Sequence, residues 1–333
     1  MSEDEEQQET SLADKSVAYL GPVGTFTEQA LYLQGDLMSA QKVPLSTMPD
    51  VLGAVESGAV DWGFVAIENS IEGTVNIALD SLIFDNNLVV QSEVVMPIEM
   101  ALIAPLHVNK ITDIKRILTF PVAAAQCREF LEAKLPGVEI VAANSTADAV
   151  RQVSKTTSKH TAALGSAVSI LHYDVHILAD DVSDSVSNKT RFLKVAKSGI
   201  PASTGHDKTT IVVFQSADKP GNLHNILGQF SARNINLTKL ESRPTKQQLG
   251  DYCFVIEFDG HVEDEVVADC LRDLHAQAKS VKFLGSYPSA GEHGPRRRRD
   301  AQAAWRAADA WITDIRSQVA PGAKRNRRFK VIK

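Results

Sequence analysis

Two loops of the chain carry residues that could bind a small anion or a polar substrate. The loop Gly21–Thr25 lies between an apolar run and a predicted helix, where free N–H groups and the helix dipole favour negative charge. Its spacing is neither a Walker loop nor GxGxxG, so a nucleotide is not indicated. Taken alone, this loop is best explained as a tight, well-capped turn. The segment Ile67–Gly73 ends a predicted strand with a cluster of polar groups, as ligand sites of open α/β sheets do, but a solvated loop is an equal alternative.

Other reactive patterns are absent from the sequence. HExxH, CxxC and GxSxG do not occur, and a predicted helix end separates His172 from His176. Cys127 lies on an apolar helix face, which indicates a core residue rather than a nucleophile. Asn188–Phe192 places polar groups before a strand, but its spacing alone does not indicate catalysis. The sequence therefore predicts no metal site and no organic cofactor.

The elements that must position these loops alternate between strands and helices. Val17–Leu20 reads as a buried strand, and capping boxes of the form S/T-x-x-D/E occur at Thr25/Glu28, Thr47/Asp50 and Ser145/Asp148. This alternation predicts an α/β domain over residues 16–197 with mostly parallel strands. Its further predicted elements are strands at 62–67, 88–95, 101–104, 138–142, 162–164, 176–178 and 191–195, and helices at 74–84, 123–134, 146–154 and 167–172.

A second domain is predicted at residues 208–288, after a linker at 198–207 that is rich in Gly, Pro, Ser and Thr. Its apolar runs are spaced as strand, helix, strand, strand, helix, strand. This βαββαβ order is the ferredoxin-like arrangement. The predicted strands are 209–215, 236–242, 252–258 and 281–284, and the predicted helices are 221–233 and 264–278.

The two ends of the chain differ from this body. Residues 1–15 are polar and predicted to be disordered, without the features of a signal peptide. Residues 289–333 form a basic tail on a chain of net charge -6, and Trp305, Trp311 and Ile315 predict an amphipathic helix there that docks on another surface. No apolar run is long enough for a membrane span, and three widely spaced cysteines indicate a reducing, cytoplasmic location.

Four motifs together resemble those of prephenate dehydratases that carry an ACT domain: GPVGTFTE at 21–28, ENSIEGTV at 68–75, TRF at 190–192 and ESRP at 241–244. The likeness covers roughly Ser16 to Pro288. It implies a catalytic domain of two α/β lobes, similar to periplasmic binding proteins, with the active site in the cleft between them. It also implies conversion of prephenate to phenylpyruvate, CO2 and water in phenylalanine biosynthesis, with allosteric feedback by phenylalanine.

The resemblance assigns Thr190 as the central catalytic hydroxyl. Because free threonine is a very weak acid, we interpret Thr190 as a hydrogen-bond donor to the leaving hydroxyl, or as a relay. Arg191 is a candidate partner for a substrate carboxylate, with a scaffold role as the alternative. The other catalytic residues implied are Glu68, which could hold a proton if burial raised its pKa, Asn69 and Gln126. The further polar positions that face the cleft are matched by Thr25, Ser70, Ser145, Thr146 and Ser166.

In the second domain the resemblance implies a phenylalanine site across an interface between two ACT units. We therefore expect a homodimer or homotetramer. The expected effector-binding residues belong to a turn and to the neighbouring strand: Pro220, Gly221, Asn222, Leu223, Leu237, Thr238, Glu241 and Ser242. The chain departs from many relatives at Phe120-Pro121-Val122, where they have His-Pro-Gln, so any role of that His and Gln has no counterpart here.

Two other functions stay open from the sequence. A two-lobed small-molecule sensor without turnover would have the same fold, although Thr190 and Gln126 favour the enzyme. A nucleic-acid regulator would use the run Arg296–Arg299, but this run lacks an aromatic platform and a recognition motif. We therefore expect no nucleic-acid and no membrane partner.

Overall fold

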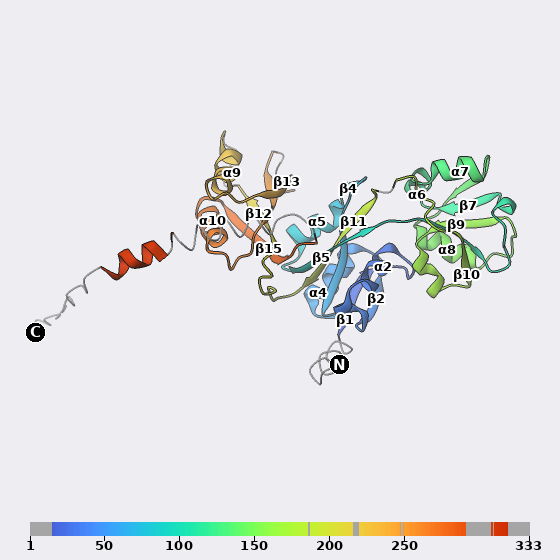
Figure 1. Cartoon of the computed structure of the whole chain (residues 1–333), viewed down its shortest axis with the longest axis horizontal. Helices are drawn as coiled ribbons and strands as arrows, with labels where there is room; N and C mark the ends of the chain where they lie inside the picture. Colours follow the sequence, from blue (N-terminus) through green and yellow to red (C-terminus); the bar gives the residue numbers. More distant parts are fainter. Residues whose placement is uncertain are drawn as a thin grey trace, which may run out of the picture.

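The computed structural model describes residues 15–185, 187–215, 220–246, 248, 250–290, 308 and 310–318. Three α/β bodies lie in a row (Figure 1): lobe 1 in the middle, lobe 2 at one end and the ACT-like domain at the other. Lobe 1 comprises residues 15–97 and 189–196, and lobe 2 comprises residues 101–179. Except for Lys15, the predicted disordered segment 1–15 lies outside the described residues.

Lobe 1 is built on a mixed sheet of order β2-β1-β3-β11-β5, with the short β4 paired to β3. Strand β11 runs antiparallel to both β3 and β5, whereas β1 is parallel to β2 and β3. Its strands are β1 Ser16–Leu20, β2 Gln41–Leu45, β3 Trp62–Asn69, β4 Gly73–Thr74, β5 Val89–Pro97 and β11 Lys189–Ala196. Its helices are α2 Phe26–Tyr32, α3 Gly35–Met38, α4 Met48–Ser57, α5 Asn76–Asp80 and the π-helix η1 Ser81–Asp85.

Lobe 2 has a second mixed sheet, of order β10-β6-β9-β7-β8. Its strands are β6 Ala101–Pro105, β7 Arg116–Thr119, β8 Glu139–Ala142, β9 Thr161–Gly165 and β10 Val175–Ala179. Its helices are η2 Ile111–Asp113, α6 Pro121–Ala125, α7 Arg128–Lys134, α8 Thr146–Ser154 and η3 Ala167–Leu171. The two lobes expected for the catalytic domain are thus confirmed.

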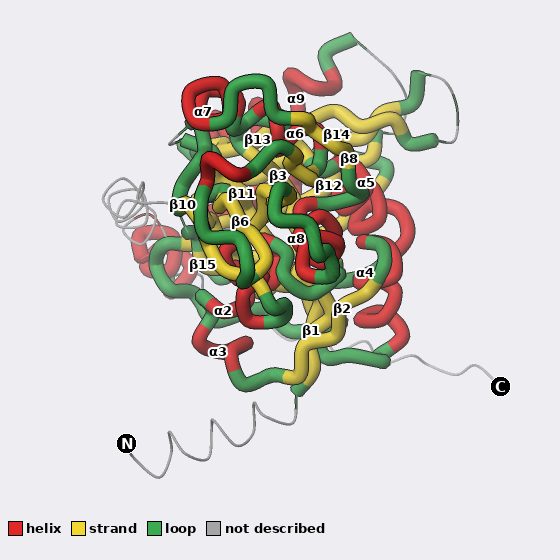
Figure 2. The backbone as a smooth tube through the Cα atoms, turned by 90° about the vertical axis from the view of Figure 1, so that its right-hand side faces the viewer, coloured by secondary structure: helices red, strands yellow, loops and turns green. Residues whose placement is uncertain are grey.

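The prediction of mostly parallel strands is confirmed by the strand directions. In lobe 1, strands β1, β2, β3 and β5 run the same way, and in lobe 2 so do β7, β8, β9 and β10. The exceptions are β6, the short β4 and β11. The chain leaves lobe 1 at the end of β5 and returns to it at the start of β11. Because both ends lie at the junction of the lobes, β11 must run opposite to β5, and it inserts between β5 and β3. Figure 2 looks along the row of domains and shows β3 and β11 near its centre, with helices around them.

Local signals predicted most helix starts and missed two breaks. Thr25, Thr47 and Ser145 accept hydrogen bonds from the backbone N–H groups three residues later, as the capping boxes predicted. The helix predicted at 74–84 instead begins after β4 and continues as a π-helix. The helix predicted at 123–134 is interrupted between α6 and α7, at Gln126 and Cys127.

The ACT-like domain has the predicted βαββαβ order, which confirms its ferredoxin-like arrangement. Its antiparallel sheet has the order β13-β14-β12-β15. Its elements are β12 Asp207–Phe214, α9 Asn222–Ala232, β13 Leu237–Pro244, β14 Tyr252–Asp259, α10 Glu265–Gln277 and β15 Ser280–Pro288. One face of this sheet packs on α9 and α10, and the other face lies on lobe 1.

The contact between the ACT-like domain and lobe 1 is a continuous apolar core. Val212 and Val255 of the ACT sheet join the same buried cluster as Val90 and Leu193 of lobe 1. At Gly285 the two backbones come so close that a Cβ would lie 2.6 Å from the carbonyl oxygen of Val90. This glycine allows the sheet to sit directly on β5.

Only part of the basic tail is described. Residues 310–317 are helical, in line with the predicted amphipathic helix. However, Trp311 is 63% exposed and Ile315 is 42% exposed, so the expected docking is not seen. Within the described ranges, no helix has the length and apolar character needed to cross a bilayer.

Candidate active site

Strands β3 and β11 pair so that two couples of residues lie opposite each other where β3 ends. Asn69 faces Thr190, and Glu68 faces Arg191. Successive side chains of a strand point to opposite faces of the sheet. Asn69 and Thr190 therefore share one face of the sheet, and Glu68 and Arg191 share the other. The side-chain contacts agree with this division.

The amide of Asn69 orients the hydroxyl of Thr190. Oδ1 of Asn69 accepts from the backbone N–H groups of Ile71 and Glu72, at 2.9 and 3.0 Å. Because these groups only donate, the other end of the amide must be the NH2 group. It donates to Thr190 Oγ1 at 2.9 Å and to Asn188 Oδ1 at 2.8 Å. Thr190 Oγ1 is thus an acceptor toward Asn69.

The same chain of hydrogen bonds continues into lobe 2 through Asn188. Nδ2 of Asn188 donates to Oε1 of Gln126 at 3.1 Å. Gln126 lies at the break between α6 and α7, and its backbone carbonyl accepts from the N–H of Asp184 at 2.7 Å. The Asp184 carboxylate in turn accepts from the N–H of Glu129, in the first turn of α7. The broken helix thus holds Gln126 against lobe 1.

This arrangement leaves two neutral donors. Among the described residues, neither the Thr190 hydroxyl hydrogen nor the Gln126 NH2 group has an acceptor. Thr190 is 8% exposed and sits in a largely water-excluded setting. Fixed donors in such a place stabilise negative charge that develops on an oxygen. The site is therefore suited to the departure of a hydroxide ion.

Sequence reasoning assigned no role to Asn188. The residue is 3% exposed and its side chain links two predicted site residues, Asn69 and Gln126. Its only sequence signal was its place two residues before Thr190. The Thr190 hydroxyl accepts a hydrogen bond from Asn69 and not from Asn188. This pairing follows from the register of β3 and β11, which the sequence does not reveal.

Arg191 and Glu68 lie on the opposite face, toward the ACT-like domain. The Arg191 guanidinium forms a bidentate pair with Glu257 of β14, at 2.7 and 2.8 Å, and reaches Glu93 at 3.0 Å and Glu68 at 3.2 Å. Glu68 also lies 3.5 Å from Nζ of Lys239 in β13. The geometry therefore favours the alternative of a scaffold role for Arg191 over a substrate-binding role. It also corrects one expectation, because the Glu68 carboxyl does not join the Thr190 cluster.

Burial and charge both act on this ionic cluster. Burial alone would raise the pKa of Glu93, but the positive charges of Lys208 and Arg191 lower it below its usual value. Burial works against the charged form of Arg191, yet Glu257 and Glu93 raise its pKa further, so it stays protonated. The Nε of Arg191 is the one buried polar atom of this side chain without a partner.

The remaining predicted hydroxyls mostly serve the backbone. Ser70 Oγ donates to the carbonyl of Ser187 and accepts from the N–H of Lys189, both at 2.9 Å, which ties the loop after β3 to the start of β11. Thr25 and Ser145 cap α2 and α8, Thr146 is the first residue of α8, and Ser166 caps η3 and donates to Gln29 at 2.5 Å. Among the described residues, these last four make no hydrogen bond to the Thr190 cluster.

Reactive groups of other kinds are buried or dispersed. Burial, with Asp184 and Asp181 nearby, raises the pKa of the Cys127 thiol to about 12, as expected for a core residue. Within the described part of the chain, no three His, Cys, Asp or Glu side chains gather as a metal site. The predicted independence from metals and cofactors stays a prediction.

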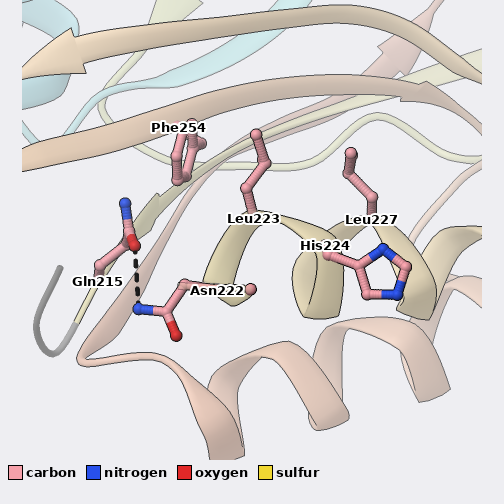
Figure 3. A pocket seen from close by; sticks show the side chains of 7 residues that line it. Gln215, Asn222, Leu223, His224, Leu227 and Phe254 are labelled. Atoms are coloured by element: carbon pink, nitrogen blue, oxygen red, sulfur yellow. Dashed lines mark hydrogen bonds between the residues drawn. The ribbon is translucent and has the colours of Figure 1, made fainter. Parts of the chain in front are cut away.

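A hollow of about 400 Å³ lies at the start of α9 in the ACT-like domain (Figure 3). Of the expected effector residues, Gly221, Asn222 and Leu223 line it, and Leu227 and Phe254 complete its apolar side. Gly221 has φ +88°, a left-handed conformation that suits glycine. The hollow therefore offers the N-terminal N–H groups of α9 beside apolar side chains.

The expected residues of β13 divide between the two faces of the ACT sheet. Ser242 lies opposite Phe254 and so is on the side of the hollow. Glu241 lies opposite Val255 and points to lobe 1, where it accepts from Thr74 Oγ1 at 2.8 Å. The expectation that Glu241 faces the effector's ammonium group does not fit this geometry. Leu237 packs on the ACT core, and Pro220 and Thr238 are exposed.

Comparison with known proteins identifies the family. A model of prephenate dehydratases matches residues 17–199, and a model of ACT domains matches residues 209–276. The prephenate dehydratase of Mycobacterium marinum is 40% identical over 282 residues, which are 82% of this chain and 88% of that protein.

Solved structures agree with these matches. A prephenate dehydratase from Arthrobacter aurescens, in complex with L-Phe, is 37% identical with a TM-score of 0.81, covering 91% of this chain and 99% of that one. GqqA, described as a novel type of quorum quenching acylase, is 26% identical with a TM-score of 0.74, covering 83% and 98%. The matched family, the two-lobed domain and the attached ACT domain together show that this chain belongs to the prephenate dehydratase family.

Proposed function

We propose that the chain converts prephenate to phenylpyruvate by donating hydrogen bonds from Thr190 and Gln126 to the departing hydroxyl. The observation that carries this proposal is the polarity of the hydrogen-bond chain. The NH2 group of Asn69 donates a hydrogen bond to Thr190 Oγ1, and that of Asn188 donates to Gln126 Oε1. The donors that remain are thereby directed at the substrate. Neutral donors also suit a substrate that already carries two carboxylates.

The reaction needs little covalent chemistry from the protein. The bond between the ring and its carboxylate breaks and releases CO2, the electron pair moves into the ring, and the C–O bond to the hydroxyl breaks. The leaving hydroxide takes up a proton and becomes water, while the ring becomes aromatic. Thr190 stabilises the oxygen as it departs or relays that proton. Loss of such a donor costs about 100- to 1,000-fold in kcat.

The polar residues at the mouths of the two lobes are proposed to hold the substrate's carboxylates. Ser70 stays in this role because its loop adjoins Asn69. Thr25, Ser145, Thr146 and Ser166 begin helices at the lobes' edges, where free N–H groups attract anions. We assign catalysis to residues 16–197 and regulation to residues 208–288, with 198–207 as linker. A cytoplasmic location is proposed for the enzyme.

We further propose that phenylalanine inhibits the enzyme by binding at the hollow beside Gly221 in a homodimer or homotetramer. The L-Phe complex of the Arthrobacter aurescens relative supports this effector. The start of α9 would receive the amino acid's carboxylate, and Leu223, Leu227 and Phe254 would contact its ring. Because Glu241 points away, a second ACT unit would supply part of the site, which requires at least a dimer.

An acylase activity, which is the activity named for GqqA, is the competing activity on this fold. Such a reaction needs an activated nucleophile, with a base within hydrogen-bond reach. Among the described residues, Thr190 contacts an amide and neither a histidine nor a carboxylate. The geometry therefore favours dehydration over acyl transfer.

Phenylpyruvate formation from prephenate, with and without phenylalanine, tests the proposal. We expect turnover without added metal and inhibition by phenylalanine, with sedimentation showing a dimer or larger. A folded protein that forms no phenylpyruvate would refute the activity. Activity that is indifferent to phenylalanine would refute only the regulation.

A further inference from the structure

Asn188 is the residue through which the two lobes meet at the candidate site. Its Oδ1 accepts from Asn69 of lobe 1 and its Nδ2 donates to Gln126 of lobe 2. It is 3% exposed, so these bonds are shielded from water. Resting on the proposed function, we infer that Asn188 is a positioning residue that determines which atom of Gln126 faces the substrate.

The direction of every bond in this chain follows from its first members. The backbone N–H groups of Ile71 and Glu72 fix the orientation of Asn69, which presents its NH2 group to Asn188. Asn188 must therefore accept on that side and donate on the other. Gln126 in turn accepts with Oε1, and its NH2 group is left for the substrate.

An acceptor in place of the Asn188 NH2 group would reverse Gln126. The Gln126 amide would rotate, donate to the new acceptor, and turn its carbonyl oxygen toward the substrate. A carbonyl oxygen repels a departing hydroxide and the substrate's carboxylates. Whether position 188 offers a donor or an acceptor thus determines whether the Gln126 amide presents its NH2 group or its carbonyl oxygen to the substrate.

Few charged groups surround Asn188. The pH dependence of a variant with a titrating group at this position should therefore report the ionisation of that group. Lys189 follows it in the chain and is exposed, and the Asp184 carboxylate is held by the start of α7. Glu68 and Arg191 lie on the other face of the strands and pair with each other. Among the described residues, no charged side chain forms a hydrogen bond or ion pair with Asn188.

The test is the pH dependence of kcat in Asn188→Asp. A carboxylate accepts from Asn69 as before but cannot donate to Gln126, so kcat near neutral pH should fall about tenfold or more. Once protonated, the new carboxyl donates to Oε1 again, and kcat should recover as the pH falls. Because Asn188 is 3% exposed and pairs with no charged side chain among the described residues, burial should raise the pKa of the new carboxyl into the range above about pH 5. The measurements are kept within that range, and the uncatalysed rate is subtracted at each pH. Asn188→Ala, which donates at no pH, is the matched control and should stay impaired throughout.

The outcomes separate this inference from the function on which it rests. A wild type that forms no phenylpyruvate refutes the proposed function itself. A wild type that is active, with Asn188→Asp as active as the wild type or impaired equally at every pH, overturns the positioning role. If Asn188→Asp does not fold, the kcat of Asn188→Ala decides. A loss of about tenfold or more in the folded variant supports the inference. A kcat equal to that of the wild type overturns it.

Discussion

The two faces of the β3–β11 pair are built from adjacent residues and have opposite chemistry. On one face, Asn69 and Thr190 belong to a neutral chain of amides that reaches lobe 2. On the other, Glu68 and Arg191 belong to an ionic cluster that reaches the ACT domain. The alternation of a strand keeps these functions one residue apart and on separate sides.

The difference shows what each face needs. The face that carries Asn69 and Thr190, the site face, must bind a dianion. Neutral hydrogen-bond donors can do so without needing a counter-ion of their own. The face that carries Glu68 and Arg191, the docking face, buries the guanidinium of Arg191 against the ACT domain. Several carboxylates must pair with this guanidinium, because an unpaired buried charge is very costly in free energy. The Thr-Arg-Phe motif therefore combines the proposed catalytic hydroxyl of Thr190 with domain docking at Arg191. A shift of the ACT sheet would act on β11 within one residue of the proposed catalytic hydroxyl.

The largest effect is expected on the docking face. Arg191→Met should lower the free energy of unfolding by about 3–5 kcal/mol, because it leaves Glu257 and Glu93 buried with fewer partners. Chemical denaturation measures the loss. The matched control is Arg116→Met, which breaks an exposed pair with Glu139 and should cost at most about 1 kcal/mol. Equal effects of the two variants would contradict a docking role.

On the site face, Thr190→Val keeps the shape of the side chain and removes its hydroxyl. We expect kcat for phenylpyruvate formation to fall about 100- to 1,000-fold, the scale for one transition-state donor. Thr190→Ser retains a hydroxyl and should keep part of the activity. A folded Thr190→Val with near-normal kcat would remove this residue from the mechanism.

In the ACT domain, Gly221→Val should weaken inhibition by phenylalanine about tenfold, or about 1.4 kcal/mol, while sparing kcat. The strain of φ +88° is the cause, since a Cβ at Gly221 meets no atom within 4 Å. Gly221→Asn is the control because asparagine tolerates this conformation, and it should stay sensitive. If stable Gly221→Val remained fully sensitive, the effector site would lie elsewhere. A melting curve beside the inhibition assay excludes general destabilisation.

The smallest effect concerns acid. The pKa of Glu93 is lower in the folded protein than its ordinary value of 4.5, so its ion pairs stabilise the fold above that pH. This contribution is lost as the pH falls from about 4.5 through the folded pKa. Glu93→Gln should lower the free energy of unfolding at neutral pH. Its free energy of unfolding should then fall less steeply in acid than that of the wild type. Unfolding free energies at several pH values would reveal parallel curves if Glu93 played no part.

Much of the fold could be predicted from local signals. Capping boxes and apolar runs located most strands of the lobes and the whole βαββαβ domain. The prediction missed β2, Gln41–Leu45, and β7, Arg116–Thr119, because both are short and partly exposed and so lack a clear apolar run. The reversed direction of β11 was also not predicted, since it depends on where the chain crosses between the lobes, a tertiary property.

The candidate site came from the family resemblance and only partly from the residues. Thr190, Asn69 and Gln126 are brought together as expected, while Glu68 and Arg191 are not. Strand alternation could have predicted that Glu68 and Arg191 lie apart from this site, because neighbouring side chains in a strand point to opposite faces of the sheet. Asn188 escaped notice because its role depends on the register between β3 and β11 and on the break before α7.

The separation of the two faces is tested most directly by comparing Thr190→Val, Arg191→Met and their double variant in one experiment. The turnover number and the free energy of unfolding are measured for each folded protein. We predict that the double variant shows the kcat loss of Thr190→Val and the stability loss of Arg191→Met, because the two side chains point to opposite faces of the sheet and their clusters share no partner. A Thr190→Val protein that keeps its kcat, beside an Arg191→Met protein that loses its kcat and keeps its stability, would contradict this division of labour.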